Sequence, residues 1–250
     1  MKFAGKTAVV TGGSRDIGRA VCVKLASEGA SVVVNYNSNE ADADTTVAAV
    51  EAAGGKAIKV KADVTKPADV DALIAASCEA FGGSIDILVN NAGGLVARKT
   101  LAEMDEEFFN FVMQLNTTST FLACKAAVPF MGEGSAILNI ASLAGRDGGG
   151  GGAIAYATSK GAVMTMTRGL AKELGPKGIR VNALCPGMIA TSFHDEFTPD
   201  AVRENVANST PLKRQGRAEE TADAVAYLAS DDASFIHGAN IDINGGLAFS

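Results

Sequence analysis

The sequence predicts an α/β fold in which a doubly wound parallel sheet of seven strands is flanked by helices on both faces. Short runs rich in Val, Ile and Leu alternate with longer Ala-rich stretches of helical spacing, and the short runs are apolar along most of their length. Such strands belong to parallel sheets that are covered on both faces, and regular strand–helix alternation gives right-handed crossovers. No repeat, linker or shift in composition divides the chain. We therefore expect residues 1–250 to form one domain.

Each expected element follows from its own pattern. Apolar β-branched runs predict strands at residues 7–10, 31–34, 57–60, 85–89, 136–140 and 180–184, and a weaker run predicts a seventh strand at 240–243. Apolar positions at helical spacing predict helices at residues 17–28, 40–53, 67–81, 105–131, 153–174 and 219–229. Gly54-Gly55 and Gly82-Gly83 are expected to end two of these helices.

One segment, residues 191–213, is less regular and contains Pro199 and Pro211. In open α/β sheets ligands bind beyond the carboxyl ends of the strands. We expect this segment to form a lid over a substrate site at that edge.

Composition and charge exclude several classes of function. Lys and Arg total 22 against 28 for Asp and Glu, a net charge of −6 that argues against a nucleic-acid partner. No run of 18 apolar residues predicts a membrane span, and the first residues have no signal-peptide core. The histidines His194 and His237 have no partner at metal-ligand spacing, so no metal site is expected. The well-separated cysteines are expected to be reduced thiols of a cytoplasmic protein: Cys22, Cys78, Cys124 and Cys185.

A glycine-rich turn, Thr11–Arg19, joins the first expected strand to the first expected helix. Glycines let backbone approach an anion closely, and a helix N-terminus offers free N–H groups and partial positive charge. Because the turn begins the first strand–helix–strand unit of the sheet, it predicts a binding site for a pyrophosphate. The alternative is an ordinary tight turn between a strand and a helix.

At this turn the chain resembles the short-chain dehydrogenase/reductase family, whose turn reads T-G-x-x-x-G-x-G. Thr11, Gly12 and Gly18 match, but Asp16 stands where the middle glycine belongs. A carboxylate beside a pyrophosphate is unfavourable, so we expect Asp16 to cap the following helix, with Arg15 offsetting its charge. The resemblance, which extends from Lys6 to Gly246, implies a Rossmann-type fold and an NAD(P) cofactor.

The end of the second strand indicates which cofactor is preferred. A carboxylate there would accept from the ribose 2′-hydroxyl and repel a 2′-phosphate, but the resemblance places Tyr36 at that position. Arg15, Asn37 and Ser38 offer a charge and short donors to a phosphate. We expect NADP(H) in preference to NAD(H). Alternatively, Asn37 and Ser38 only begin a turn.

The resemblance extends to three further cofactor segments. It implies an adenine contact at Asp63-Val64, a ribose contact at the N-N-A-G sequence 90–93, and carboxamide contacts from Ile189 and Thr191 in the P-G-x-x-x-T sequence 186–191. The full set of expected cofactor residues is Gly12, Ser14, Arg15, Asp16, Ile17, Gly18, Tyr36, Asn37, Ser38, Asp63, Val64, Asn90, Asn91, Ala92, Gly93, Tyr156, Lys160, Pro186, Gly187, Ile189 and Thr191.

Tyr156 and Lys160 carry the strongest chemical signal. Four residues apart on one helix, they share a face. A free tyrosine has a pKa near 10, and a nearby cation lowers that pKa toward the range useful for proton transfer. Such a pair also arises by chance on solvated helices.

The resemblance adds Ser142 and Asn116, which complete a tetrad with Tyr156 and Lys160 in family order. The spacing from Ser142 to Tyr156 is one residue longer than usual, and we expect the glycine run at 148–152 to absorb it. The family chemistry interconverts a carbonyl and a secondary alcohol: Ser142 holds the oxygen, Tyr156 exchanges the proton, Lys160 lowers the Tyr156 pKa and holds the ribose, and Asn116 holds a water. A non-catalytic dinucleotide sensor is the alternative, supported only by Asp16.

Basic residues near the expected substrate mouth are Arg98, Lys99, Arg146 and His194. Converging cations suit an anionic substrate such as a 3-oxoacyl thioester, or a keto-uronate or keto-sugar, although scattered surface charge would look the same. The resemblance also implies a homotetramer, paired through the helices at 105–131 and 153–174 and through the C-terminal segment.

Overall fold

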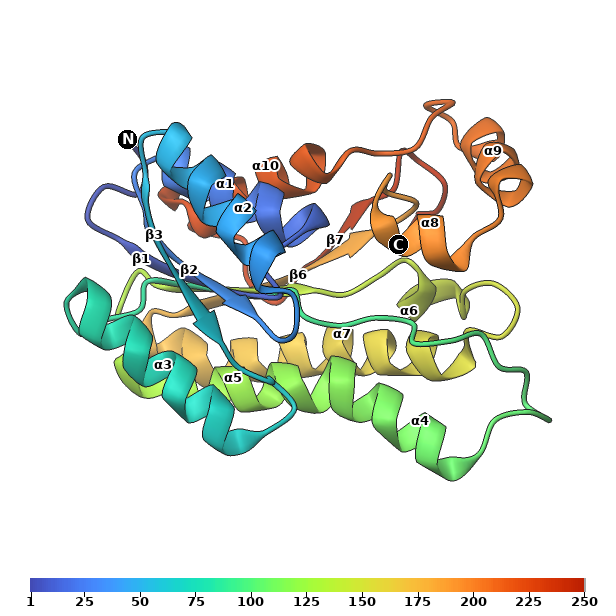
Figure 1. The fold of residues 1–250 in the computed structure, drawn as a ribbon, viewed down its shortest axis with the longest axis horizontal. Helices are drawn as coiled ribbons and strands as arrows, with labels where there is room; N and C mark the ends of the chain where they lie inside the picture. Colours follow the sequence, from blue (N-terminus) through green and yellow to red (C-terminus); the bar gives the residue numbers. More distant parts are fainter. Residues whose placement is uncertain (250) are drawn as a thin grey trace.

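The computed structural model describes residues 1–249 and contains a seven-stranded, all-parallel sheet in the order β3-β2-β1-β4-β5-β6-β7 (Figure 1). The strands are β1 (Thr7–Thr11), β2 (Ser31–Tyr36), β3 (Lys56–Lys61), β4 (Ile87–Asn90), β5 (Ala136–Ile140), β6 (Arg180–Pro186) and β7 (Asn240–Ile243). Strand order reverses between β1 and β4, which is where a doubly wound sheet forms its binding crevice. The predicted fold is confirmed.

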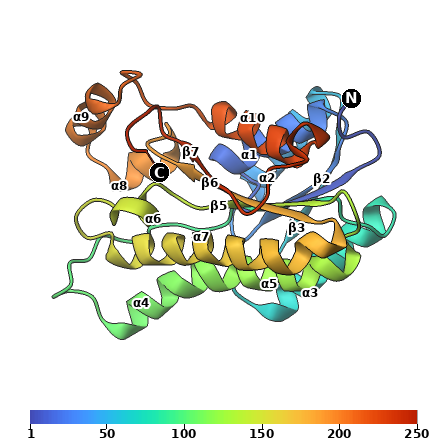
Figure 2. The same ribbon diagram turned by 180° about the vertical axis from the view of Figure 1, so that it is seen from behind.

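Helices cover both faces of the sheet. One face carries α1 (Asp16–Ser27), α2 (Glu40–Ala52) and α10 (Ala218–Ala229). The other carries α3 (Pro67–Phe81), α4 (Glu106–Met113), α5 (Ser119–Ala127) and α7 (Ile154–Leu174). The two opposed views show these layers above and below the strands (Figures 1 and 2).

The apolar strands alternate between two cores. Ala8 and Val10 of β1 pack in the core beneath α1 and α10, whereas Val9 packs in the core beneath α3, α5 and α7. In β5, Leu138 and Ile137 divide between the same two cores. This double burial explains why the strands read as continuous apolar runs.

The helix expected at 105–131 is not continuous. A π-turn, Gln114–Thr118, separates α4 from α5, and a 3₁₀ turn, Val128–Phe130, follows α5. Asn116 lies inside the π-turn, and its side-chain amide donates to the carbonyls of Val112 and Gly94, both at 3.0 Å. A side chain that binds backbone in this way stabilises a local departure from α-helical spacing.

The lid segment 191–213 is more regular than predicted. It contains α8 (Ser192–Phe197) and α9 (Asp200–Ser209), which Pro199 separates as the residue before α9. Both helices lie beyond the sheet at the right of Figure 1, in orange.

Residues 1–249 contain neither a helix suited to a membrane nor a cluster of metal ligands. No helix there combines the length and the apolar character that crossing a membrane requires. No group of three His, Cys, Asp or Glu side chains within this part of the chain is arranged to hold a metal ion.

Candidate active site

A cavity of about 760 Å³ opens at the carboxyl ends of the strands, between the loops that follow β1 to β6. Every residue expected to bind cofactor lines it, with the exception of Asn90. Ser142, Tyr156 and Lys160 line the same cavity. The dinucleotide turn and the chemically active side chains therefore share one space.

The glycine-rich turn is held by side chains from neighbouring strands. The Gly12 amide donates to Asn35 Oδ1 at 3.0 Å, and Asn91 Nδ2 donates to the carbonyls of Thr11 and Gly12 at 3.1 and 2.9 Å. A Cβ on Gly18 would lie 2.1 Å from the Gly12 carbonyl oxygen, so only glycine fits there. Asn35, which ends up buried in β2, was not singled out from the sequence; a polar residue inside an apolar strand was its only signal.

The first turn of α1 fits an anion. Its capping position is Arg15, which makes no side-chain cap hydrogen bond. Ser14, Arg15 and Ile17 at this turn line the cavity. Free amides and a helix N-terminus at a glycine cradle suit a pyrophosphate.

Asp16 does not cap α1, and this prediction is wrong. The residue has φ of +50°, a left-handed conformation that costs a non-glycine residue about 1 kcal/mol. Its carboxylate instead accepts from the Ser192 amide at 3.1 Å and from the Ser192 hydroxyl at 2.5 Å, at the start of α8. Arg15 Nε lies 3.8 Å from Asp16, so the expected charge partner is in place.

Asn90 lies away from the cavity, contrary to its prediction as a cofactor residue. It is 3% exposed, and its Nδ2 donates to Asn139 Oδ1 of β5 at 2.9 Å. Asn139 in turn donates to the Thr167 hydroxyl of α7 at 2.9 Å. The three side chains form a buried ladder that fixes β4, β5 and α7 relative to one another.

Ser142 and Tyr156 line the same cavity despite the longer spacing between them, and the Ser142 side chain is close enough to oppose the rise in the Tyr156 pKa. The intervening loop contains Gly148, Gly149 and Gly152, which all have φ between +72° and +88°. Lys160 Nζ lies 5.8 Å from the centre of the Tyr156 ring and donates to the Ile140 carbonyl at 2.7 Å. The expected triad is thus assembled within one cavity.

The expected lowering of the Tyr156 pKa is not present in this structure. Burial raises the pKa of Tyr156, and the Ser142 side chain offsets only part of that rise. Burial also lowers the pKa of Lys160 from its ordinary 10.5 to about 8. The Lys160 ammonium donates to a carbonyl rather than to the phenol, which explains why desolvation dominates at both groups.

Asn116 is fully buried and does not line the cavity. Besides its two donated bonds, its Oδ1 accepts from the Gly94 amide at 2.9 Å. A Cβ on Gly93 would lie 2.4 Å from this oxygen and 3.3 Å from Lys160 Nζ. Asn116 therefore braces the loop after β4 directly beside the lysine.

Of the four basic residues expected near the substrate mouth, Arg146 lies outside the cavity, and His194 lies in it without the expected charge. Arg146 faces β7, where its Nε donates to Asp242 at 2.7 Å and its Nη2 donates to the Asn240 carbonyl at 2.7 Å, outside the cavity. His194 lines the cavity, but burial, with help from Arg203 and Arg98, lowers its pKa to about 4, so the ring is neutral at pH 7.

Arg98 does line the cavity, and its side chain spans two loops. Its Nε donates to the Phe197 carbonyl at 3.0 Å and its Nη1 to the Gly151 carbonyl at 2.8 Å. Lys99, beside it, lies 4.5 Å from the centre of the Phe108 ring and 4.0 Å from Asp105. The basic rim expected from the sequence is reduced to Arg98.

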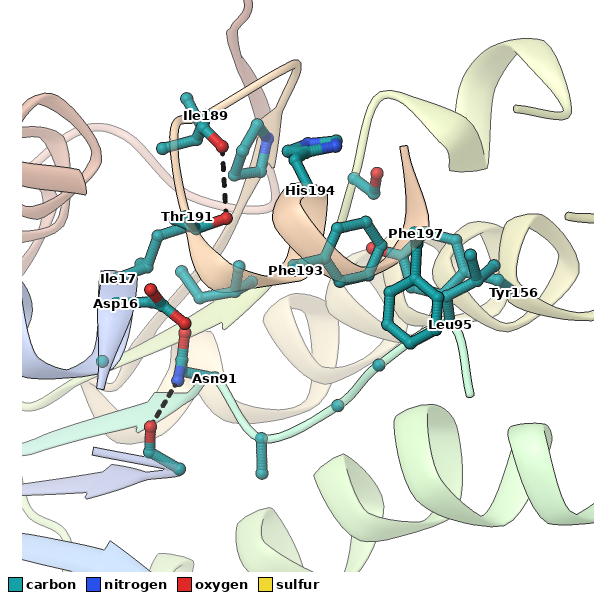
Figure 3. A pocket seen from close by; sticks show the side chains of 18 of the residues that line it. Asp16, Ile17, Asn91, Leu95, Tyr156, Ile189, Thr191, Phe193, His194 and Phe197 are labelled. Atoms are coloured by element: carbon teal, nitrogen blue, oxygen red, sulfur yellow. Dashed lines mark hydrogen bonds between the residues drawn. The ribbon is translucent and has the colours of Figure 1, made fainter. Parts of the chain in front are cut away.

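An apolar wall was missed. Phe193 and Phe197 of α8 line the cavity with Leu95, and the Phe193 ring lies 5.8 Å from the Tyr156 ring and 5.3 Å from the Phe197 ring, centre to centre. Figure 3 shows these side chains gathered beside Tyr156, with His194 on the same helix. The spacing of four residues between the phenylalanines was the signal that could have revealed the wall.

Comparisons with known proteins agree with this geometry. A family profile described as enoyl-(acyl carrier protein) reductase matches residues 12–248. The chain is 41% identical over 244 residues to the uncharacterized oxidoreductase YgfF of Escherichia coli, covering 96% of this chain and 98% of that one. It is 40% identical over 249 residues to a 3-oxoacyl-[acyl-carrier-protein] reductase of a Synechocystis species, covering 98% of each.

Solved structures of several relatives superpose on nearly the whole chain. A short-chain dehydrogenase/reductase from Serratia marcescens superposes with a TM-score of 0.94 at 35% identity over 100% of both chains. A short-chain dehydrogenase from Burkholderia cenocepacia in complex with NADP gives 0.93 at 34% over 99% of both, and an NADH-dependent reductase responsible for alginate metabolism gives 0.90 at 35% over 99% of both. With its turn, its cavity and its assembled Ser, Tyr and Lys, this chain belongs to the short-chain dehydrogenase/reductase family and is an NAD(P)-dependent oxidoreductase.

Proposed function

We propose that the protein interconverts a carbonyl and a secondary alcohol, with Tyr156 as the acid and base. The observation that carries this proposal is that Ser142, Tyr156 and Lys160 meet in the cavity that also holds the glycine-rich turn, with Lys160 Nζ 5.8 Å from the Tyr156 ring centre. The nicotinamide supplies hydride transfer when it is bound. The side chains then have to bind the carbonyl oxygen and exchange one proton with it.

Each side chain has a role that its surroundings support. Ser142 accepts from the Ala144 amide at 3.1 Å, which leaves its hydroxyl proton free to be donated to the carbonyl oxygen. Tyr156 transfers the proton to that oxygen. Lys160, which a pKa of about 8 keeps mainly protonated at pH 7, offers its remaining N–H donors to the cofactor ribose. Asn116 holds the loop around Lys160 in place.

For the cofactor we propose NADP(H). The carboxyl end of β2 presents Tyr36, Asn37 and Ser38 to the cavity, without a carboxylate at the strand end. Asp42, in the first turn of α2, also lines this region, but Asn39 donates to its carboxylate at 2.7 Å and Arg19 lies 3.7 Å from it. The Burkholderia relative in complex with NADP is a precedent, whereas the alginate-metabolism relative is described as NADH-dependent.

For the substrate we propose a carbonyl compound with an apolar group beside the reacting carbon, of which a 3-oxoacyl thioester is one class. The wall formed by Leu95, Phe193 and Phe197 lies against Tyr156, and His194 is neutral, so the immediate surroundings of the carbonyl favour apolar contact. The Synechocystis relative named for 3-oxoacyl substrates agrees with this choice. A keto-uronate would need more cations than Arg98 alone supplies.

We also propose a homotetramer located in the cytoplasm. Phe111 of α4, Phe121 of α5 and Ile154 of α7 are large apolar side chains that are between 45% and 50% exposed, on the helices through which pairing is expected. All four cysteines are free thiols, which suits a reducing compartment.

The dinucleotide-sensor alternative loses its one support, because the Asp16 carboxylate is bound to Ser192 rather than left facing the phosphates. The deciding experiment is Tyr156→Phe, assayed with NADPH and NADH against an acetoacetyl thioester, a keto-uronate and neutral aryl ketones. Losing the proton donor is expected to lower kcat roughly 10²–10⁴-fold and to leave the NADPH Kd within about twofold.

Tyr227→Phe on α10 is the matched control, since Tyr227 is 46% exposed and lies outside the cavity. Full turnover in Tyr156→Phe would refute the proposed mechanism. Activity confined to the keto-uronate would overturn the proposed substrate class, and a lower Kd for NADH than for NADPH would overturn the proposed cofactor.

A further inference from the structure

Asp16 makes a contact that its position in the glycine-rich turn does not require. Its backbone adopts φ of +50°, which a glycine would adopt without strain, and yet a carboxylate stands there. Both carboxylate oxygens are used: one accepts from the Ser192 amide and the other from the Ser192 hydroxyl. The contact joins residues 176 positions apart, one in the cofactor turn and one in the lid.

The helix on the far side of this contact carries the substrate wall. Ser192 is the first residue of α8, which also presents Phe193, His194 and Phe197 to the cavity. Thr191, expected to hold the nicotinamide carboxamide, immediately precedes it. Figure 3 shows Asp16 close to Thr191, with Phe193 further along the same helix. Wherever Asp16 holds Ser192, it therefore also sets the position of Thr191 and Phe193.

We propose that Asp16 is a positioning residue that latches α8 onto the cofactor-binding turn and so links lid closure to cofactor binding. This inference rests on the proposed function, because the lid matters only if a substrate is enclosed beneath it. The residues of α8 are at most partly buried, so its packing is weaker than that of the sheet-covering helices. Its other end is held by Arg98 at the Phe197 carbonyl. The Asp16–Ser192 contact is the anchor on the cofactor side.

Charge provides the link between the two events. A carboxylate at this turn repels the cofactor phosphates unless its charge is offset. In the closed arrangement two donors from Ser192 and the Arg15 guanidinium, 3.8 Å away, face the Asp16 carboxylate. Opening the lid removes the two Ser192 donors and leaves the negative charge beside the phosphates. Cofactor binding therefore favours the closed lid, and by thermodynamic reciprocity the closed lid favours cofactor.

Two variants that break the same latch are expected to act oppositely on cofactor affinity. Ser192→Ala leaves the carboxylate with fewer donors, so the NADPH Kd should rise about threefold or more. Asp16→Gly removes both the charge and the strained backbone, so the NADPH Kd should stay the same or fall. Both variants should loosen α8 and raise the KM for the carbonyl substrate about three- to tenfold, with kcat changed less than about threefold.

The experiment measures the NADPH Kd by fluorescence, KM and kcat by NADPH oxidation, and amide hydrogen exchange across 192–198 in the NADPH-bound enzyme. Exchange there should be about tenfold faster in both variants than in the wild type. Ser209→Ala is the matched control, because the Ser209 hydroxyl is exposed and bonds only to the Asn205 carbonyl within α9.

Unchanged exchange in both variants, or a Kd that rises equally in both, would overturn the latch. Hydrogen exchange and cofactor affinity need no carbonyl substrate. If the wild type reduces no carbonyl, the proposed function fails while these two measurements still decide the latch.

Discussion

The catalytic frame and the lid lie on two sides of one cavity and are held in different ways. The frame, formed by β4, β5 and α7, is tied together by the buried ladder Asn90–Asn139–Thr167, whose members are at most 3% exposed. The residues of the lid helices α8 and α9 are partly buried or exposed, and none is fully buried. Side-chain contacts made by Asp16, Arg98 and Arg203 hold the lid instead.

The difference between the rigid frame and the weakly held lid separates the part that carries out proton transfer from the part that admits the substrate. Proton transfer requires positions fixed within a fraction of an ångström, and buried hydrogen bonds supply that rigidity. Substrate admission requires a part that opens, and a few solvent-accessible contacts permit it. Changes in the frame should therefore affect kcat and stability, whereas changes in the lid should affect KM and local exchange.

The largest expected effect comes from Lys160→Met in the frame. Removing the ammonium should lower kcat roughly 10²–10⁴-fold, because the donors proposed to hold the cofactor ribose beside Tyr156 are lost. Stability should increase by about 1–3 kcal/mol, since a desolvated charge with a pKa of about 8 is replaced by an apolar chain of similar length. Urea unfolding and steady-state kinetics on the same preparations measure both.

The pH dependence of stability checks the same variant independently. In the wild type the folded state releases the Lys160 proton near pH 8, whereas the unfolded chain holds it to about 10.5. Between these values the unfolded state binds more protons, so the contribution of Lys160 makes the protein more stable as pH rises from 8 to 10.5. Lys160→Met should lack this rise. An identical rise in both proteins would show that Lys160 is not desolvated.

The sequence predicted the frame better than it predicted the lid, and the reason is physical. Tyr156, Lys160 and Ser142 lie at strand ends or on one helix face, so local spacing and strand order fix their meeting. The pairing of Asp16 with Ser192 depends on how a loop folds back from a distance of 176 positions, and no local pattern encodes it. The helix cap expected for Asp16 was the best local alternative, and tertiary contact overrode it.

The sequence predicted the charge states of the site residues less well than it predicted their positions. Arg146 and His194 are basic by type, but Asp242 binds the first away from the cavity and burial keeps the second neutral. The Tyr156 pKa follows the same rule, since burial raises it and the Ser142 side chain offsets only part of that rise. Sequence gives a group's ordinary pKa, whereas desolvation and partners appear only once the fold is known.

A smaller effect is expected from Arg98→Gln at the lid. Losing the bonds to the Phe197 and Gly151 carbonyls should raise KM about two- to fivefold for neutral ketones with kcat nearly unchanged. Arg168→Gln, an exposed position on α7, is the charge-matched control. If Arg98 instead binds an anionic substrate directly, KM should rise far more for acidic substrates than for neutral ones, and that result would contradict its assignment to the lid.

The smallest effect is expected from His194→Gln and appears only under acidic conditions. The folded protein keeps His194 neutral down to about pH 4, whereas the unfolded chain protonates it near 6.5. Between these values the unfolded state holds more protons, so the His194 contribution is lost progressively as pH falls from 6.5 to 4 and is constant above that window.

Glutamine retains a polar group that can reach Thr198, the present hydrogen-bond partner at 3.0 Å, without titrating. Urea unfolding at several pH values should show equal stability at pH 7.5 and a shallower acid loss in the variant, because carboxylates titrate alike in both proteins and cancel in the difference. Since the residues of α8 are only partly buried, hydrogen exchange across 192–198 should accelerate on acidification in the wild type before global unfolding begins. Parallel acid losses in the two proteins would mean that His194 stays in contact with water, which would contradict the desolvation of the cavity side of α8.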